Sequence, residues 1–357
     1  MIFEEVLEIK NGKNQRAVEN PEGKYPIYGS GGIMGYADDY ICEADTVIVG
    51  RKGSINNPLY VEEPFWNVDT AFGLEAKREV LIPKYLYYFC RKFDFERLNK
   101  AVTIPSLTKS DLLKIEIDVP DLDVQQKVVD KLAKIEQIIQ LRKKELLALD
   151  NLIKARFVEM FGDPRSNPFG FEKKMLKDTC KVITGNTPSR AIAEYYGDYI
   201  EWIKTDNIVS GILNPTQATE SLSEKGMNVG RTVEKDSILM ACIAGSIASI
   251  GRVCVTDRTV AFNQQINAVV PEQYNILFLY VLLQISKDYL VEDINMALKG
   301  ILSKSKLEEK EFIIPPMDLQ EQFANFVHQV DKSKVAVQKS LDETQQLFDS
   351  LMQQYFG

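Results

Sequence analysis

The segment Pro120–Leu132 reads PDLDVQQKVVDKL, and a close variant, PPMDLQEQFANFV, occupies Pro315–Val327. The two segments start 195 positions apart, and the same offset carries Phe161 onto Phe356 with no insertion or deletion between them. A long repeat at a fixed offset is typical of a duplicated structural unit. The sequence therefore predicts two copies of one element, one in each half of the chain.

Both copies read as a single long helix. Asp123 followed by Gln126, and Asp318 followed by Glu321, form capping-box patterns at the two helix starts. Apolar residues then alternate at spacings of three and four, which indicates a coiled-coil seam rather than a surface helix of one domain. The seam residues are Val128, Leu132, Ile135, Ile139, Leu146, Leu149, Ile153 and Met160 in the first copy and Phe323, Val327, Val330, Val337, Leu341, Phe348, Leu351 and Tyr355 in the second.

Polar side chains interrupt the two seams at Arg142, Arg156, Lys334 and Thr344. Each of them matches an apolar residue in the other copy, so the two helices are not interchangeable. These residues either set the register of a paired coil or extend to solvent at its rim.

The segments before the helices repeat more loosely, which indicates two heads that have diverged. Gly53 aligns with Gly245 at an offset of 192, and Trp66–Asp69 aligns with Phe262–Gln265 at an offset of 196. A helix of 38 residues from Val124 to Phe161 would extend about 57 Å. To bury its seam, the second helix should fold back antiparallel along the first. The expected class is α+β, with two mixed α/β heads, two long antiparallel coiled-coil helices and a pseudo-two-fold internal repeat, divided into 1–120, 121–162, 163–315 and 316–357.

Composition excludes several classes of function. The chain has one histidine, so sites built on several histidines are excluded. Its five cysteines are scattered without a CxxC pair, which argues against structural zinc or disulfides and for a reducing cytoplasm. No secretory signal pattern opens the sequence, and no apolar run approaches the roughly 20 residues of a membrane span. The glycine cluster Tyr28–Gly32 matches no nucleotide-binding loop. We expect no catalytic residue, metal, cofactor or membrane contact.

The net charge of −8 speaks against a non-specific nucleic-acid coat. A sequence-specific reader can still be acidic overall if its Lys and Arg side chains converge on one face. Two heads on a rigid spacer suit a bipartite DNA target with parts more than one turn of roughly 34–36 Å apart. The same geometry also suits a non-enzymatic interaction scaffold with protein-binding heads.

Several head segments resemble a known family. YPIYGSGGIMGY (Tyr25–Tyr36), VIVGRKGSI (Val47–Ile55) and WNVDTAF (Trp66–Phe72) look like a target recognition domain of type I restriction-modification specificity subunits. TGNTPSR (Thr184–Arg190), YIEWIKTDNI (Tyr199–Ile208) and FNQQI (Phe262–Ile266) resemble another variant of that domain, and the helix openings resemble the family's conserved spacer regions. The second head departs from the pattern where Ala241–Ala244 replaces the basic pair of the first head, which puts a phosphate contact there in doubt.

The resemblance implies a division of labour. The chain would bind double-stranded DNA and no nucleotide or methyl donor. It would recruit two methyltransferase subunits and, through them, restriction subunits. Each head would read one part of an asymmetric bipartite target, so that the partners methylate one adenine on each strand.

Polar side chains in glycine-flanked loops are the candidates for DNA contact, because Arg, Lys, Asn and Gln are the residue types that read base edges. In head one they are Lys13, Asn14, Arg16, Tyr28, Ser30, Arg51 and Lys52, and in head two they are Asn186, Thr187, Ser189, Arg190, Lys204, Thr205, Asn207 and Gln264. Equivalent positions of the two helices are candidates for symmetric docking of two partners, although helix caps also repeat for folding reasons. These are Gln125, Gln126, Phe161, Gln320, Glu321 and Phe356.

Overall fold

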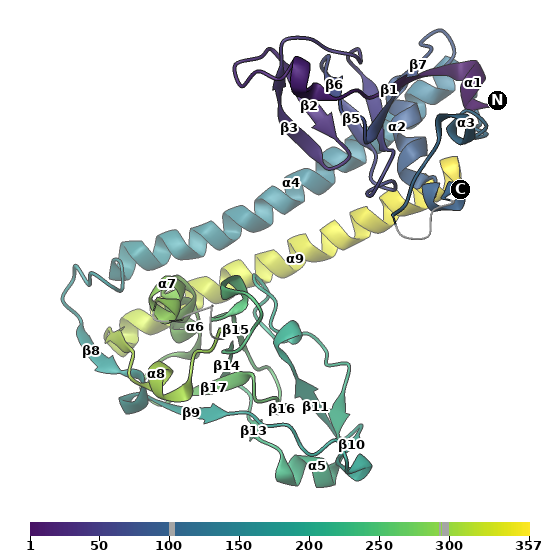
Figure 1. Ribbon diagram of the computed structural model, residues 1–357. Coiled ribbons are helices and arrows are strands. Elements are labelled where there is room, and N and C mark those ends of the chain that lie inside the picture. Colours follow the sequence, from purple (N-terminus) through teal and green to yellow (C-terminus); the bar gives the residue numbers. More distant parts are fainter. Residues whose placement is uncertain (100–103, 293, 295–299) are drawn as a thin grey trace. The chain divides into compact units, whose positions relative to one another are not determined.

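The computed structural model describes residues 1–99, 104–292, 294 and 300–357. Two compact units make up the chain: unit one holds Met1–Lys143 and Lys339–Gly357, and unit two holds Lys144–Gln338. Each unit contains one head and a section of both long helices, α4 (Leu122–Phe161) and α9 (Met317–Phe356) (Figure 1). The expected α+β class with two heads and two long helices is confirmed.

Head one is the part of unit one that precedes α4. Its strands are β1 (Leu7–Asn11), β2 (Tyr25–Gly29), β3 (Gly32–Ala37), β4 (Thr46–Gly50), β5 (Leu59–Val61), β6 (Trp66–Asn67) and β7 (Ala71–Ala76). Its helical elements are α1 (Phe3–Val6), η1 (Gln15–Ala17), α2 (Pro83–Lys92), η2 (Phe95–Leu98) and α3 (Lys109–Leu112). The strands form an antiparallel sheet of order β1-β7-β4-β5 and a smaller sheet of order β3-β2-β6. Every residue of β4 is buried, as expected for a strand paired on both edges with α2 against it.

In unit one, α2 packs against both long helices. The Tyr88 hydroxyl donates a hydrogen bond to Glu136 of α4 at 2.6 Å. The Tyr88 ring also meets Phe348 of α9 edge-on, with ring centroids 6.4 Å apart. One turn earlier in α2, Tyr85 meets Phe356 near the end of α9, with centroids 5.0 Å apart. A hydrogen bond to α4 and aromatic contacts with α9 therefore anchor head one to the helix pair.

Head two lies in unit two between the long helices in sequence. Its strands are β8 (Glu172–Met175), β9 (Cys180–Thr184), β10 (Tyr196–Gly197), β11 (Ile200–Ile203), β12 (Ser221–Leu222), β13 (Thr232–Val233), β14 (Ile238–Ala241), β15 (Val253–Val255), β16 (Val260–Phe262), β17 (Ile266–Pro271) and β18 (Glu311–Ile314). Its helical elements are η3 (Leu176–Asp178), η4 (Ala193–Tyr195), η5 (Thr205–Asn207), α5 (Glu224–Val229), η6 (Ile247–Ser249), α6 (Ile276–Ile285), α7 (Lys287–Val291) and α8 (Lys304–Glu308). Its sheets have the orders β15-β14-β17-β9, β10-β12-β11-β16-β13 and β18-β8.

In unit two, α4 and α9 run antiparallel. Phe161, at the end of α4, meets Phe323 near the start of α9, with ring centroids 5.6 Å apart. Phe278 of α6 joins this cluster, 4.9 Å from the Phe161 ring. About three turns back along α4, Asp150 pairs with Lys334, which lies about three turns farther along α9, at 2.7 Å. Residues earlier in α4 therefore pair with residues later in α9, as in an antiparallel helix pair.

The polar interruptions of the seam have different roles. Lys334 joins the two helices through Asp150, and it also donates to the Gly211 carbonyl at 2.8 Å. Arg156 and Thr344 bond within their own helices, to Glu159 and to the Ser340 carbonyl. The buried Nε of Arg142 has no hydrogen-bond partner among the described residues. Lys334 is therefore the interruption that best fits a register-setting role.

The backbone ladders correct two alignments made from the sequence. The Gly53 amide donates to the Pro105 carbonyl at 3.1 Å, and the Ala244 amide donates to the Gly300 carbonyl at 3.4 Å. Gly53 therefore corresponds to Ala244 and not to Gly245, because hydrogen bonds rather than residue identity define the equivalence.

The second alignment shifts by one residue in the same way. Gly12 and Gly185 follow the equivalent strands β1 and β9, and their amides donate to the Ala71 and Ile266 carbonyls. This fixes an offset of 195, equal to the helix offset, so that Trp66 corresponds to Ala261 rather than to Phe262. The offset of 195 therefore holds from this part of each head through its long helix.

Candidate nucleic-acid interface

A close backbone crossing builds the first candidate surface in head one. The Lys13 amide donates to the Asn67 carbonyl at 3.0 Å, and the Trp66 indole donates to the Lys13 carbonyl at 3.0 Å. A Cβ atom on Gly12 would lie 1.8 Å from the Val68 carbonyl oxygen. Only glycine fits at this crossing, and the main-chain N–H and C=O of the next residue, Lys13, both have hydrogen-bond partners. The Lys13 side chain is left exposed on a fixed backbone.

Two further loops of head one meet the same segment. The Arg51 amide donates to the Thr70 carbonyl at 2.8 Å, and its guanidinium lies 5.7 Å from the Phe72 ring centroid. The β2–β3 turn comes close as well, because the Val68 amide donates to the Tyr28 carbonyl at 3.0 Å and a Cβ atom on Gly50 would lie 3.0 Å from the Ser30 Cβ. Segment 66–72 thus gathers three loops that carry predicted contact residues, including the exposed Lys52 beside Arg51.

The remaining candidates of head one have local roles. Asn14 caps η1, its Oδ1 accepting from the Arg16 amide at 2.9 Å, and both residues are exposed. Tyr28 is half-buried against Phe65, with ring centroids 5.4 Å apart. Burial raises the pKa of the Tyr28 hydroxyl, so this group remains a neutral donor.

The same crossing recurs in head two. The Asn186 amide donates to the Phe262 carbonyl at 3.2 Å, and the Trp202 indole donates to the Asn186 carbonyl at 3.3 Å. A Cβ atom on Gly185 would lie 2.1 Å from the Asn263 carbonyl oxygen. The tryptophan comes from β11 here and from β6 in head one, which are different strands of the equivalent parallel pair. In both heads a tryptophan indole therefore donates to the equivalent carbonyl, that of Lys13 or Asn186, but the tryptophan comes from a different strand.

The crossing in head two brings further candidates together. The Thr187 hydroxyl bonds the Gln264 side-chain oxygen, which joins two exposed loop residues. The Asn186 amide group donates to the Val229 carbonyl at 2.9 Å. The Asn186 side-chain oxygen is buried and has no hydrogen-bond partner among the described residues. Asn186 is therefore held inside the loop, whereas Thr187 and Gln264 face outward.

Trp202 is also the centre of a charged cluster. The Arg190 guanidinium and the Lys204 ammonium lie 5.4 Å and 5.3 Å from its ring centroid. Each cation binds one oxygen of Glu220, at 2.7 Å for Arg190 and 2.6 Å for Lys204. Hydrogen bonds from Lys204 and Arg190 hold the pKa of the Glu220 carboxyl below its usual value.

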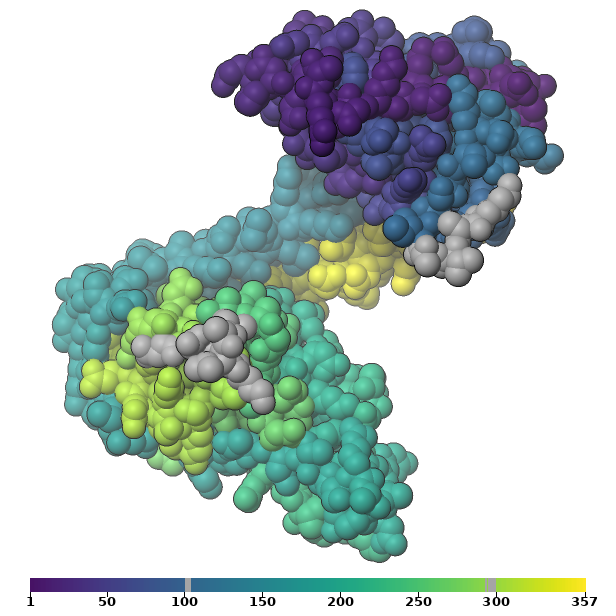
Figure 2. All heavy atoms as spheres, in the orientation of Figure 1, coloured from purple at the N-terminus to yellow at the C-terminus, as the bar shows by residue number. Residues whose placement is uncertain are grey.

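Segment 186–230, coloured teal to green, reaches the tip of head two (Figure 2).

Two of the other candidates of head two, Thr205 and Asn207, lie in the loop that follows β11, and Ser189 lies in an earlier loop. Asn207 is buried; its Oδ1 accepts from the Lys204 amide at 3.0 Å and its Nδ2 donates to Thr216. The Thr205 carbonyl accepts from the Arg252 guanidinium at 3.2 Å. Ser189 is exposed in the loop before η4. Asn207 and Arg252 thus hold this loop in place, and Glu220, which binds both Arg190 and Lys204, is the interface candidate that sequence reasoning missed.

The two heads differ at the turn that carries the basic pair of head one. The Cys242 and Ile243 amides both donate to the Gln265 carbonyl, as the Arg51 and Lys52 amides do to that of Thr70. Apolar residues therefore replace both cations of head one.

The predicted partner residues divide into buried and exposed groups. Gln125 and Gln320 are buried, and both bond backbone groups at the start of a helix. Phe161 is buried in the core of unit two, and Phe356 packs against α2. Gln126 and Glu321 are both exposed. Two of the six predicted residues therefore remain fully open to a partner.

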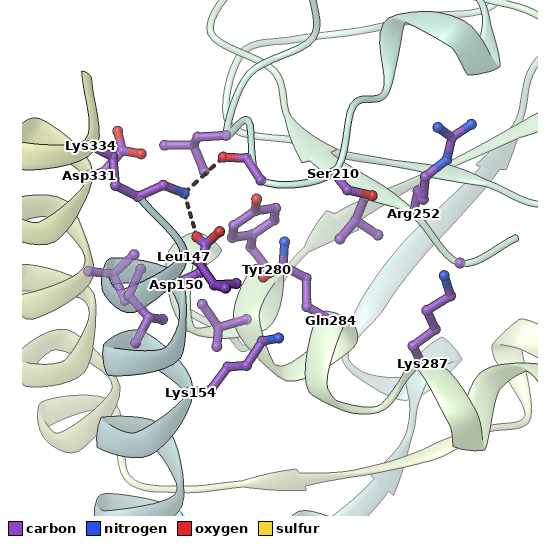
Figure 3. A pocket seen from close by; sticks show the side chains of 17 residues that line it. Leu147, Asp150, Lys154, Ser210, Arg252, Tyr280, Gln284, Lys287, Asp331 and Lys334 are labelled. Atoms are coloured by element: carbon purple, nitrogen blue, oxygen red, sulfur yellow. Dashed lines mark hydrogen bonds and ion pairs between the residues drawn. The ribbon is translucent and has the colours of Figure 1, made fainter. Parts of the chain in front are cut away.

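Unit two also contains a cavity of about 310 Å³ lined by α4, α6, α9 and two loops of head two. Figure 3 shows the Lys334 ammonium between Asp150 and a backbone carbonyl in its wall. Arg252 and Lys287 donate to main-chain carbonyls of head two. These cations are engaged in holding head two together or tying it to the helices, and the cavity carries no defined ligand chemistry.

Within residues 1–99, 104–292, 294 and 300–357, His, Cys, Asp and Glu side chains form no cluster suited to a metal ion. Among these same residues, no helix has the length and apolar character of a membrane span.

Comparison with known proteins gives one consistent family. The family described as "Type I restriction modification DNA specificity domain" matches residues 3–151 and 168–345. The HindI specificity subunit of Haemophilus influenzae is 31% identical over 334 residues, covering 71% of this chain and 72% of the relative. The MjaIX specificity subunit of Methanocaldococcus jannaschii is 24% identical, covering 85% of this chain and 73% of the relative.

Solved structures agree on the fold. The crystal structure of a type I restriction-modification S subunit from M. genitalium matches with a TM-score of 0.66 and 17% identity, over 100% of this chain and 95% of that one. A structure described under complex assembly and conformational transition of the type I R-M system matches with a TM-score of 0.59. The chain belongs to the type I restriction-modification DNA specificity family, as a non-catalytic specificity subunit.

Proposed function

We propose that this chain reads a bipartite DNA sequence, one part with each head, for a type I restriction-modification complex. The glycine crossing carries the proposal, because it recurs in both heads and presents different side chains. Lys13 follows the crossing glycine in head one, with Arg51 bonded to the adjoining Thr70, whereas Thr187 and Gln264 lie at the crossing in head two. A shared backbone with different base-reading side chains suits an asymmetric target.

The long helices would set the gap between the two parts of the target. The 40 residues of α4 correspond to about 60 Å of helix. One turn of DNA is roughly 34–36 Å, so a spacer of this length suits parts separated by more than one turn.

The helices would also recruit the partners. The proposed assembly contains two methyltransferase subunits and, through the complex, restriction subunits, in a reducing cytoplasm. The solved relative from a study of complex assembly in a type I R-M system supports partners of this kind. Gln126 and Glu321 are equivalent and exposed, so they could meet two identical partners in the same way.

Methylation mapping tests the proposal most directly. The chain would be expressed with its methyltransferase partner in cells that lack other adenine methylation, and the modified positions would be sequenced. We expect one methylated adenine on each strand within a two-part motif with a fixed gap. Methylation without a shared motif, or a motif without a gap, would reject the reading function or its bipartite form.

Salt dependence tests the basic turn of head one. Arg51→Ala together with Lys52→Ala should reduce the slope of log binding constant against log salt concentration by up to about 1.8, since each phosphate contact contributes about 0.9. The control is the pair Lys173→Ala and Lys174→Ala in β8, whose loss should leave the slope nearly unchanged. An unchanged slope in the Arg51/Lys52 variant would remove this turn from the interface.

A further inference from the structure

Arg190 of head two is held on three sides. Its guanidinium lies 4.7 Å from the Tyr196 ring centroid and 5.4 Å from that of Trp202. Its Nη2 donates to Oε2 of Glu220 at 2.7 Å. The side chain nevertheless remains 58% exposed. A guanidinium has five N–H donors in a planar fork, so an arginine held in this way still has donors facing outward.

The platform beneath Arg190 is itself fixed. Trp202 is buried, and its indole donates to the Asn186 carbonyl at the glycine crossing. The Tyr196 hydroxyl donates to the Pro188 carbonyl at 2.7 Å, and the Trp202 amide donates to the Glu220 carbonyl at 3.0 Å. The aromatic rings and the carboxylate that orient Arg190 are therefore tied to the backbone of the candidate interface.

Lys204 changes the charge balance of the cluster. It binds the second oxygen of Glu220 at 2.6 Å, and its side chain is only 25% exposed. The single negative charge of Glu220 is thus shared by two cations, so the cluster carries a net charge of one positive unit. Lys204 lies inward and Arg190 outward, which leaves the surplus charge on the exposed guanidinium.

A fixed guanidinium suits a base edge better than a phosphate. Arginine bonded to O6 and N7 of guanine is the commonest specific contact in the major groove, and it requires a defined plane. Phosphate contacts tolerate a mobile cation and carry no sequence information. We propose that Arg190 reads a guanine in the part of the target bound by head two, with Glu220 as its positioning residue and Lys204 balancing the charge. The inference rests on the proposed DNA-reading function.

The first test is selection of bound duplexes by the full chain with its methyltransferase partner. Duplexes randomised across the target would be bound, recovered and sequenced for the wild type, Arg190→Ala and Arg190→Lys. The wild type should select guanine at one position on the head-two side. Both variants should lose that preference by roughly 5- to 150-fold, the range of a bidentate base contact, and keep the head-one preferences.

Glu220→Gln separates positioning from general structure. It keeps the side-chain size and removes the negative charge, so the guanine preference should fall while binding to mismatched duplexes becomes stronger. Loss of folding would instead weaken binding to every duplex and lower the thermal midpoint. Lys225→Ala is the matched control, because Lys225 pairs with Glu194 in the same head with both side chains 69% exposed. It should leave the base preference unchanged.

The outcomes separate the role of Arg190 from the proposed DNA-reading function of the chain. If Arg190→Ala folds normally and weakens all duplexes equally, Arg190 contacts phosphate and the inference is overturned, with DNA reading intact. If Glu220→Gln leaves guanine discrimination unchanged, Glu220 is not a positioning residue. If the wild-type complex selects no sequence at all, the proposed function itself fails.

Discussion

Replacing Gln125 tests whether the repeated glutamine stabilises the fold or binds a partner. Its Oε1 accepts from the Ile82 amide at 2.8 Å, and its Nε2 donates to the carbonyls of Val80 and Pro120 at 2.8 Å and 2.7 Å. Gln125→Met keeps most of the side-chain volume and removes all three bonds. At about 1 kcal/mol for each bond, unit one should lose about 3 kcal/mol of unfolding free energy.

Urea unfolding followed by tryptophan fluorescence would measure this loss. The chain has two tryptophans, one in each head, so a Trp202→Phe background leaves Trp66 as the reporter of unit one. The midpoint should fall without a change in slope, as expected when stability changes and the exposed surface does not. Gln320→Met should cost less, about 2 kcal/mol in unit two, because Gln320 makes two such bonds, to the Asn275 amide and the Pro315 carbonyl.

The neighbouring residue is the matched control. Gln126 is exposed and bonds Asp130 one turn along the same helix, so Gln126→Met should change stability by less than about 0.5 kcal/mol. Equal unfolding midpoints for the Gln125 and Gln126 variants would refute the folding role. Loss of methyltransferase binding in a fully stable Gln125 variant would instead restore the partner role predicted from the repeat.

Three further predictions follow from the same structure. Gly12→Ala and Gly185→Ala should each destabilise their own head by more than about 2 kcal/mol in urea, because the new Cβ would overlap backbone, whereas Gly31→Ala, with open space around it, should stay within about 0.5 kcal/mol. Lys334→Met and Asp150→Leu should show a coupling of about 1 kcal/mol in a double-mutant cycle, and additive effects would contradict a bond between the helices. Burial raises the pKa of three thiols of head two to about 12, so these thiols should resist thiol reagents in the native protein at pH 8, and rapid labelling would contradict this. The free energy of unfolding should also fall from pH 9 toward 12, because the thiols ionise at lower pH in the unfolded chain than in the native one. These thiols are Cys180, Cys242 and Cys254.

The long helices were predictable because their signals are local. The alternation of apolar positions specifies length and buried face without reference to the rest of the chain. The capping boxes placed the starts too late, because α4 begins at Leu122 and α9 at Met317, so that Asp123 and Asp318 lie inside the first turn. Seam residues such as Leu132 and Phe323 are indeed buried. The burial of Gln125 was not predictable for the opposite reason: glutamine is mostly exposed in proteins, and only distant backbone groups reveal why this one is buried.

The candidate surface was only partly predictable. Glycine-flanked loops identified Lys13 and Arg190, but the partners that orient them come from elsewhere in the chain. Glu220 lies 30 residues from Arg190, and no local pattern connects the two. The alignment of the heads slipped by one residue because identical residues in loops were matched, whereas the strand ladders keep the true register.

In the proposed function, the duplication lets two heads read different sequences without different folds. Gly12 and Gly185 have the same role, since each permits a backbone crossing that no larger residue could make. The tryptophan that holds this crossing changed strand between the heads, yet the carbonyl it binds stayed the same. The two heads therefore share the backbone contacts of the crossing and differ in the side chains on it. Their variation would change the bases that each head prefers and leave the helix pair unaltered.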